Sequence, residues 1–246
     1  MLELTGKNAL VTGGSRGIGA AIARALAEKG ADVAITYARS PDHAAQVVGA
    51  IEALGRRGVA IQADSADPVA IRASVEQAVA RLGGLDILVN NAAIATYSPI
   101  ADFPLADIDA LLAVNIRGPV VAAQAAIPHL SAGARIINIG SAGADRIVGS
   151  PGTIYYMTKS ALQSFTRGLA QELGGRDITV NLVQPGSTNT DMNPETGEFA
   201  DFQRSLMPLG RYGQPEDVAA AVAFLATSAA RQITGTSLTV DGGALT

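Results

Sequence analysis

The sequence predicts a single α/β domain built on a doubly wound sheet of seven parallel strands. Along its 246 residues, short apolar segments alternate with longer segments whose apolar residues recur at helical spacing. The first of these short segments, 8–12, has a run that is apolar throughout, as in a parallel strand that helices cover on both faces. No Pro/Ser-rich linker, charge block or short repeat interrupts this alternation. Regular strand–helix alternation implies right-handed crossovers within one sheet, so we expect one domain over residues 1–246.

The first half of the chain contains four of the expected strands. A glycine-rich turn follows the first strand, and a helix with apolar residues recurring from Ile18 to Leu26 follows the turn and ends at Gly30. Pro68 lies near the start of a later helix, where its missing N–H is tolerated. The expected strands are 8–12, 32–36, 59–63 and 85–90, and the expected further helices are 42–54 and 67–82.

The second half repeats the pattern with three more strands. These strands are expected at 134–139, 178–183 and 237–240, and the helices at 105–113, 116–130, 154–173 and 215–228. Residues 186–212 are the least regular stretch, because they contain Gly186, Pro194, Gly197, Pro208 and Gly210. A long irregular segment inside a compact domain is often a binding loop, so we expect a substrate loop or lid at about 186–212.

Composition and charge argue against several classes of function. The chain has 18 Lys plus Arg against 22 Asp plus Glu, and its net charge of −4 offers no general attraction to nucleic acid or anionic membranes. It has no Cys and only His43 and His129, so we expect no metal site. The first residues form no signal peptide, and no apolar run approaches the roughly 18 to 20 residues of a membrane span. We expect a cytoplasmic protein with no nucleic-acid or membrane partner.

The glycine-rich turn between the first strand and the first helix predicts a dinucleotide site. Missing side chains at Gly13, Gly17 and Gly19 permit a tight turn, close approach of a pyrophosphate and close helix–strand packing. The helix that follows offers free N–H groups and a partial positive charge to phosphates. A flexible turn is the alternative, but the position in the α/β pattern favours binding. The expected cofactor-contacting residues of this turn are Gly13, Ser15, Arg16, Gly17, Ile18 and Gly19.

Several motifs in order along the chain carry a family resemblance. The glycine spacing is Gly-x-x-x-Gly-x-Gly, and it is followed by Asn90-Asn91-Ala92, Asn115, Ser141, Tyr155-x-x-x-Lys159, Pro185-Gly186 and Ile233-Thr234-Gly235. Each motif alone is weak, but the ordered set is highly specific. Over nearly its whole length the sequence resembles the short-chain dehydrogenase/reductase family, and most closely its 3-oxoacyl-carrier-protein-reductase-like branch. The resemblance implies a Rossmann fold and an oxidoreductase.

The end of the second expected strand bears on the choice between NAD and NADP. An NAD site usually has an Asp or Glu there, whereas this chain has no carboxylate between Ile35 and Asp42. Arg16 and Arg39 could each bind a 2′-phosphate through charge-assisted hydrogen bonds, although both could also be ordinary surface arginines. We favour NADP(H), with Tyr37 and Arg39 at this site. Asp64 and Ser65 match the family's adenine-contacting position, although Asp64 could equally cap the next helix.

Tyr155 and Lys159 are four residues apart on an expected helix, so they share one face. A tyrosine pKa near 10 is too high for efficient acid–base catalysis near neutrality. At ~4 Å and an effective dielectric of ~20, the Lys charge would favour the phenolate by about 4 kcal/mol, or roughly three pKa units. The resemblance assigns Tyr155 as the acid/base and Lys159 as the group that lowers the Tyr pKa and holds the nicotinamide ribose. Tyr156 has only Ser160 four residues on, so it lacks such a charge.

The resemblance also assigns the remaining site residues. Ser141 would hydrogen-bond the substrate oxygen, and Asn115 would support a proton-relay water near Lys159. A turn hydroxyl and a helix cap are the alternative interpretations of these two residues taken singly. Asn91 and Ala92 would contact the cofactor, although Ala93 stands where the family usually has glycine. Pro185, Gly186 and Thr188 resemble the segment that contacts the nicotinamide carboxamide.

The substrate is less well defined. A carrier protein is acidic and needs a basic docking face, but the segment 128–133 offers only His129, with Arg135 and Arg176 near, so an acyl carrier protein is weakly supported. A broader NADPH-dependent reductase of small-molecule carbonyls fits equally well. The expected pocket wall comprises Ile94, Thr96, Asp145, Arg146, Ile147 and 188–206. Asp145 and Arg146 could bind a polar substrate, but we expect them to form a surface ion pair instead.

One alternative belongs to another class of function. The segments 64–67, 145–146 and 183–186 resemble a branch that binds a cyclic dinucleotide and regulates biofilm dispersal. A protein of that kind would use the same fold as a binding module. The family resemblance also implies a homotetramer built from the helices 105–130 and 154–174 and the C-terminal strand.

Overall fold

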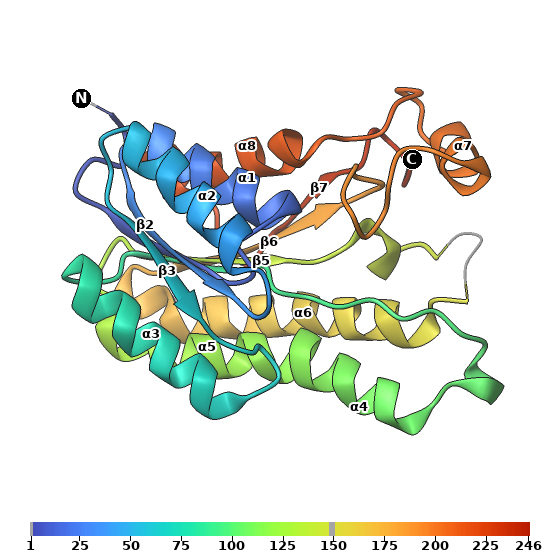
Figure 1. Cartoon of the computed structure of the whole chain (residues 1–246), viewed down its shortest axis with the longest axis horizontal. Helices are drawn as coiled ribbons and strands as arrows, with labels where there is room; N and C mark the ends of the chain where they lie inside the picture. Colours follow the sequence, from blue (N-terminus) through green and yellow to red (C-terminus); the bar gives the residue numbers. More distant parts are fainter. Residues whose placement is uncertain (1, 148–150) are drawn as a thin grey trace.

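Seven parallel strands form one sheet in the order β3-β2-β1-β4-β5-β6-β7 in the computed structural model, which describes residues 2–147 and 151–246 (Figure 1). Each expected strand is confirmed to within two residues at either end. The seven strands are β1 Asn8–Val11, β2 Asp32–Tyr37, β3 Gly58–Gln62, β4 Ile87–Asn90, β5 Arg135–Ile139, β6 Thr179–Pro185 and β7 Ser237–Val240.

Helices cover both faces of this sheet (Figure 1). On one face lie α1 Gly17–Glu28, α2 Pro41–Ala53 and α8 Pro215–Ala226; on the other lie α3 Pro68–Leu82, α5 Gly118–Ala126 and α6 Thr153–Leu173. Each layer has its own core, with Ile22 and Leu26 fully buried in the first and Leu88 and Ile136 in the second. This double coverage explains why inner strands such as β1 and β4 are mostly apolar.

The order of the strands reverses between β1 and β4, because the chain moves outward from β1 to β3 and then returns to the other side of β1. In open α/β sheets, ligands bind beyond the carboxyl ends of the strands at such a switch point. The glycine turn follows β1 at this place, and Asn90 ends β4 beside it. The fold therefore brings the motif-bearing loops to one edge of the sheet.

The helix from Leu105 to His129 differs from its expected form. Two separate helices were expected, but α4 Leu105–Leu112 continues through a π-turn, Ala113–Arg117, into α5 and a final 3₁₀ turn. The π-turn accommodates one extra residue without ending the helix. At the junction, Gly118 lies so close to Ser65 that an added Cβ would come within 3.0 Å of the Ser65 carbonyl oxygen.

This continuous helix also corrects the expectation about apolar length. By length and composition it could cross a membrane, with a mean hydropathy of 1.5 over its most apolar window. More than half of that window is buried inside the fold, where α5 packs against α3 and β4. The apolar composition is that of a core helix.

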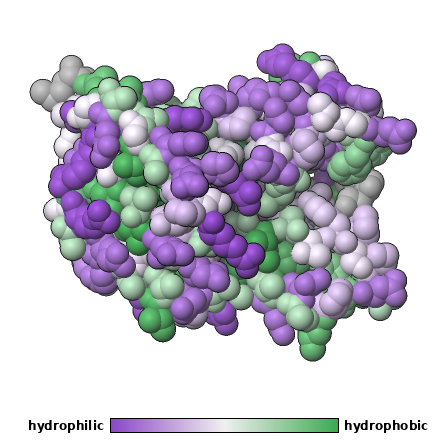
Figure 2. Space-filling model, viewed as in Figure 1, coloured by the Kyte–Doolittle hydropathy of each residue, from purple (hydrophilic) through white to green (hydrophobic). Residues whose placement is uncertain are grey.

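The segment 186–212 contains a helix that was not expected, α7 Glu198–Ser205. Only Ala200 of this helix is buried, and it packs with Met207 and Tyr212 in a small separate cluster. The charges carry a signal for it, since Glu198 and Asp201 lie in the first turn and Arg204 in the last. Figure 2 shows a mostly hydrophilic face with apolar patches in the hollow below α7.

Candidate active site

The glycine turn after β1 is shaped by close packing. Gly13 and Gly17 have φ values of 64° and 52°, in the left-handed region that favours glycine. A Cβ on Gly19 would collide with the Gly13 carbonyl oxygen and the Asn91 amide nitrogen. A Cβ on Gly14 would come within 2.6 Å of the Ile35 side chain, so this glycine, which the motif reasoning passed over, is also required.

Side chains from two neighbouring strands brace this turn. Thr36 on β2 accepts a hydrogen bond from the Gly13 N–H at 3.0 Å. The Asn91 amide donates to the carbonyl oxygens of Thr12 at 2.9 Å and Gly13 at 3.1 Å. The Thr12 hydroxyl accepts from the N–H groups of Asn91 and Ala92. The side chain of Asn91, which was expected to contact a cofactor, therefore bonds to the turn instead. Thr12 and Thr36 also belong to the site, although the motifs did not predict them.

The amino end of α1 is open to an anion. Its N-cap residue, Arg16, makes no capping hydrogen bond through its side chain, and the first turn contains no acidic residue. Arg16 lies on a groove of about 310 Å³ that Ser15, Gly17 and His43 also line. Its guanidinium lies 3.4 Å from the carboxylate of Asp191 at the start of the 186–212 segment. Arg39 is exposed and forms no ion pair with any described residue.

Asp64 and Ser65 lie beyond β3, beside the same edge of the sheet. The Asp64 carboxylate accepts a hydrogen bond from the Ala66 N–H at 2.9 Å and so closes a local turn. The helix cap is instead Asp67, whose carboxylate accepts from the Val69 N–H at 2.8 Å. The alternative that Asp64 caps α3 is therefore wrong.

Tyr155 and Lys159 lie on the same face of α6, as their spacing predicted, and both are buried. The Lys159 ammonium donates a hydrogen bond to the Ile139 carbonyl oxygen at 3.0 Å and lies 5.9 Å from the centre of the Tyr155 ring. Ser141, just beyond β5, lies close enough for its side chain to lower the pKa of Tyr155. The three side chains come from two different segments and converge beyond the ends of the strands.

Burial dominates the electrostatics of this pair. It raises the pKa of Tyr155 well above its usual value, Tyr97 and Tyr156 raise it further, and the hydrogen bond with Ser141 offsets only a part. Burial also lowers the pKa of Lys159 to about 8. Burial therefore outweighs the lowering of the Tyr155 pKa that was expected from Lys159, because exclusion of water disfavours the phenolate.

Asn115 lies inside the π-turn, fully buried. Its side chain accepts a hydrogen bond from the Ile94 N–H at 3.0 Å and donates to the Ile94 carbonyl oxygen at 2.9 Å. It also donates to the hydroxyl of Thr158, the neighbour of Lys159, at 3.1 Å. Asn115 therefore ties the loop after β4 to α6. The interpretation of Asn115 as a mere helix cap is wrong.

Two other tyrosines lie beside the ring of Tyr155. The Tyr155 ring lies 5.7 Å from the Tyr97 ring and 5.2 Å from the Tyr156 ring, centre to centre. Tyr156 packs against Gly143 and Gly152, where a Cβ on either glycine would collide with its ring. Tyr97 is 47% exposed and lies beside the reactive tyrosine, although nothing in the motif pattern marked it.

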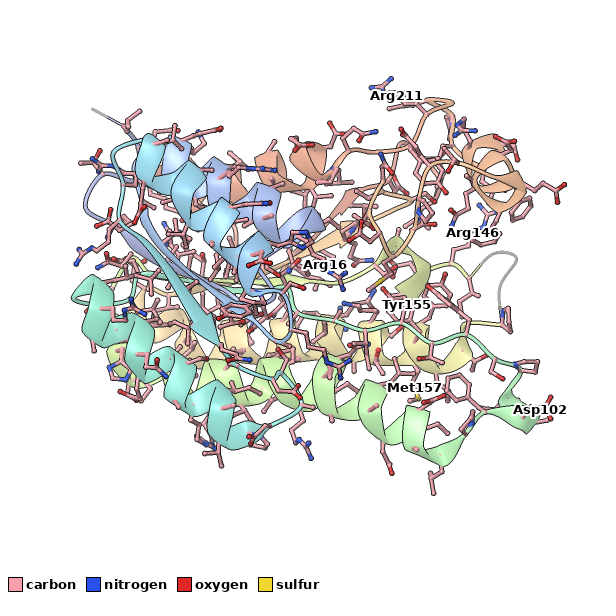
Figure 3. The ribbon with its side chains drawn as sticks, viewed as in Figure 1. Arg16, Asp102, Arg146, Tyr155, Met157 and Arg211 are labelled. Atoms are coloured by element: carbon pink, nitrogen blue, oxygen red, sulfur yellow. The ribbon has the colours of Figure 1, made fainter. Side chains whose placement is uncertain are left out.

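The expected ion pair between Asp145 and Arg146 is absent. The Asp145 carboxylate instead accepts hydrogen bonds from Gln163 at 2.6 Å and Gln184 at 2.7 Å. Figure 3 shows Arg146 and Tyr155 facing the space between α6 and α7, with Arg16 nearer to the strand ends. A carboxylate and two amides form a polar network here, which the simple pairing of charges did not predict.

The segment after β6 lies over this space. Pro185 ends β6, and a Cβ on Gly186 would come within 2.6 Å of Asp241, so glycine is required there. The Thr188 hydroxyl donates to the Gly186 carbonyl oxygen at 3.1 Å, and Thr188 pairs with Gly213 in a short β-bridge. These two contacts fix the position of Thr188, from which the rest of the 186–212 segment continues.

The basic residues near the end of α5 form internal bonds. Arg176 donates to the carbonyl oxygens of Ile127 and Leu130, Arg135 donates to that of Gly133, and His129 lies 3.0 Å from Glu76. Arg135 is itself buried. Since Arg135 is buried and His129 faces a carboxylate, Arg176 is the exposed cation among these three residues.

Comparison with known proteins identifies the family. The model of a family described as Enoyl-(Acyl carrier protein) reductase matches residues 13–245. The crystal structure of a short chain dehydrogenase from Burkholderia cenocepacia J2315 in complex with NADP is 56% identical, covers 99% of this chain and 100% of its own, and superposes with a TM-score of 0.98. The chain therefore belongs to the short-chain dehydrogenase/reductase family, and the predicted fold and family are confirmed.

Curated relatives within the family differ in what they do. Versicolorin reductase stcU of Emericella nidulans is 42% identical, over 98% of this chain and 97% of its own length. The cyclic-di-GMP-binding biofilm dispersal mediator protein of Escherichia coli K12 is 44% identical, over 98% of both chains. The family alone thus allows both an enzyme and a ligand-binding regulator.

Proposed function

We propose that this protein is an NADP(H)-dependent reductase that converts the carbonyl of a small ketone into an alcohol. The observation that carries this proposal is the buried Tyr155 hydroxyl within reach of Ser141, with the Lys159 ammonium behind it. These groups lie beyond the strand ends, at the switch point where the glycine turn and the uncapped amino end of α1 also lie. The arrangement joins a proton donor to a dinucleotide site.

The residues present fit a phosphorylated dinucleotide. Unpaired N–H groups at the start of α1, with no acidic side chain in its first turn, suit a pyrophosphate. Ser15, Gly17, Ile18 and Gly19 would hold it there, while Arg16, Tyr37 and Arg39, near the end of β2, would meet the 2′-phosphate. Asp64 and Ser65 lie at the adenine end, and Ala92, Pro185, Gly186 and Thr188 at the nicotinamide end.

The reduction divides between hydride and proton transfer. Bound NADPH supplies a hydride to the carbonyl carbon. Tyr155 donates its hydroxyl proton to the carbonyl oxygen, and Ser141 donates a hydrogen bond to the same oxygen. The phenolate left on Tyr155 is stabilised by the Lys159 ammonium, and solvent returns the proton. Asn115 keeps the loop after β4 and α6 at a fixed distance during this exchange.

The lowered pKa of Lys159 predicts the pH dependence of reduction. Lys159 is charged below its pKa of about 8 and loses its charge as the pH rises through that value. Tyr155, with its raised pKa, stays protonated over the same range. We therefore expect kcat/KM for ketone reduction to fall above pH 8, measured from pH 6 to 10. The surface variant Lys29→Met should leave this profile unchanged, and a flat profile to pH 10 in the unmodified protein would contradict the assignment.

The arginines at the adenosine end predict a preference for NADPH over NADH. Arg39→Ala should raise the dissociation constant for NADPH about tenfold, because a charge-assisted hydrogen bond is lost. Asp191→Asn should lower it about two- to fivefold, because Asp191 pairs with Arg16 and repels a phosphate. Neither change should alter the affinity for NADH, and the quenching or enhancement of cofactor fluorescence measures all four values. Equal effects on both cofactors would contradict the assignment.

The hollow below α7 favours a substrate with a sizeable apolar part. Phe199 and Phe202 on α7 are both exposed, as is Tyr97 beside Tyr155. We propose that 186–212 acts as the substrate loop, anchored at Thr188 and Gly213. The similarity to a versicolorin reductase supports a small-molecule substrate, whereas an acyl carrier protein has little support because Arg135 is buried and His129 faces Glu76.

The direct test follows absorbance at 340 nm with NADPH or NADH against a panel of carbonyls. The panel includes apolar aromatic ketones, a 3-oxoacyl thioester, simple ketones and an aldehyde. We expect oxidation of NADPH with at least one ketone, and its loss in Tyr155→Phe. A preference for NADH would overturn the roles of Arg16 and Arg39, and the absence of turnover despite NADPH binding would favour a binding module.

A cyclic-dinucleotide-binding regulator is the second candidate function. Its support is the 44% identity to the cyclic-di-GMP-binding biofilm dispersal mediator over almost the whole chain. The complete set of Asn115, Ser141, Tyr155 and Lys159 favours catalysis instead. Calorimetry with cyclic-di-GMP decides: heat at micromolar ligand supports the regulator, and its absence eliminates it.

A homotetramer in the cytoplasm is the final part of the proposal. Val120 on α5 and Met157 on α6 are large apolar side chains that the single chain leaves exposed on the helices expected to form the interface. Light scattering at micromolar concentration should give four times the chain mass of 25.0 kDa. A mass of one chain would overturn the tetramer.

A further inference from the structure

Behind Ser141 lies the network of Asp145, Gln163 and Gln184, which the reaction as described does not use. Gln184, on β6, is fully buried, and its amide nitrogen donates to the Ser141 carbonyl oxygen at 3.1 Å and to one Asp145 carboxylate oxygen at 2.7 Å. The other carboxylate oxygen accepts from the amide of Gln163, on α6, at 2.6 Å. The network therefore joins β6, α6 and the turn that begins at Ser141.

The turn itself holds the Ser141 side chain only loosely. The Ser141 hydroxyl accepts a hydrogen bond from the Gly143 N–H at 3.2 Å, and the Ala144 N–H donates to the Ser141 carbonyl oxygen at 3.0 Å. Both bonds lie within the turn, so they move with it. Two other bonds connect the turn to neighbouring elements. The Gln184 amide donates to the Ser141 carbonyl oxygen, and the Ser160 hydroxyl donates to the Ala144 carbonyl oxygen.

The carboxylate at position 145 decides how Gln184 is oriented. Both hydrogens of the Gln184 amide nitrogen are used, one on Ser141 and one on Asp145. A carboxylate offers only acceptors, so it matches two amide donors at once. An amide at position 145 would place an NH₂ group against one of the two glutamines. If Gln184 then turned over to accept that hydrogen, its oxygen would face the Ser141 carbonyl oxygen, and two acceptors would meet.

We propose that Asp145 is a positioning residue, which acts through Gln184 to fix the backbone of Ser141 so that the Ser141 hydroxyl faces the Tyr155 hydroxyl. The proposal rests on the proposed function, in which Ser141 and Tyr155 act on the carbonyl oxygen. Gln163 connects the same carboxylate to α6, the helix that carries Tyr155. Asp145 thus fixes the positions of the Ser141 and Tyr155 hydroxyls relative to each other.

The test is a double-mutant cycle between Asp145→Asn and Ser141→Ala, with ketone reduction by NADPH as the readout. Asp145→Asn should lower kcat about tenfold, because a small displacement of a reacting group is costly. The KM for NADPH and the melting temperature should stay unchanged, since Asp145 lies on the surface and away from the glycine turn. In the Ser141→Ala background the same change should have no further effect, because the group that it positions is gone.

Each other outcome overturns the proposal. Full activity of Asp145→Asn, or an equal loss in both backgrounds, means that Asp145 does not act through Ser141, while inactivity of Tyr155→Phe would still leave the proposed function standing. Full activity of Ser141→Ala removes the group on which both ideas rest, so the proposed role of Ser141 fails together with the positioning. Asp102→Asn is the matched control, because Asp102 lies at the outer tip of the segment after β4, far from Tyr155 (Figure 3).

Discussion

Replacing Tyr155 with phenylalanine is expected to lower kcat/KM for ketone reduction about 10²- to 10⁴-fold, the usual contribution of a positioned general acid. The substitution keeps the ring, which packs between Tyr97 and Tyr156, and removes only the hydroxyl. Because that hydroxyl contacts no part of the glycine turn, NADPH should bind with its original affinity. Steady-state rates at 340 nm and a fluorescence titration measure the two effects separately.

Tyr156→Phe is the matched control for this substitution. Tyr156 is the next residue on α6, and its ring packs against Gly143, Gly152 and the Tyr155 ring. Loss of its hydroxyl should leave kcat/KM within about twofold of the original value, because the substitution keeps this ring packing and leaves the proton donor in place. If both variants lost activity equally, the acid would not be Tyr155 alone.

The second large effect is expected at Gly19. In Gly19→Ala the new methyl group would collide with the Gly13 carbonyl oxygen and the Asn91 amide, both parts of the braced turn. Relief requires the turn to shift, at a cost typical of overpacking, about 1–3 kcal/mol. If the shift of the turn distorts the site that binds the phosphates, the dissociation constant for NADPH rises about 10- to 100-fold. Titration with NADPH and a melting curve record both consequences.

Gly49→Ala provides the control. Gly49 lies in the middle of α2, and a Cβ there meets nothing within 4 Å. Alanine should therefore stabilise the helix by about 0.5–1 kcal/mol and leave NADPH binding unchanged. Retention of full NADPH affinity in Gly19→Ala would show that the turn adapts and that its glycines are not needed for the cofactor.

Much of the fold could be predicted from the sequence because the inner strands are buried on both faces. The first three residues of Ile87–Asn90 are apolar for that reason, and apolar runs are the clearest signal that a sequence carries. Helix α7 was missed because it buries only Ala200, so it has almost no apolar stripe. The π-turn at Ala113–Arg117 could not be foreseen either, since it depends on contacts of Asn115 with Ile94 and Thr158, which are distant in the sequence.

The candidate site was predictable where residue type and spacing determine the chemistry. Four residues on a helix bring Tyr155 and Lys159 to one face, whatever surrounds them. The spacing does not predict how deeply Tyr155 is buried, and burial reverses the expected direction of its pKa shift. Sequence neighbours do not predict hydrogen-bond partners either, because Asp145 bonds to Gln163 and Gln184 rather than to the adjacent Arg146. Neighbours in space, supplied by other elements, determine both properties.

The π-turn in the helix Leu105–His129 constrains the number of residues in this helix as well as their types. An α-helix rotates by about 100° for each residue. Removing or adding one residue between Leu105 and Asn115 would therefore turn α4 away from α6, or turn Asn115 away from Ile94 and Thr158. Related proteins that keep this network should accordingly differ here by exchange of residues and not by insertion or deletion, and an alignment gap in this stretch would mark a chain that has lost it.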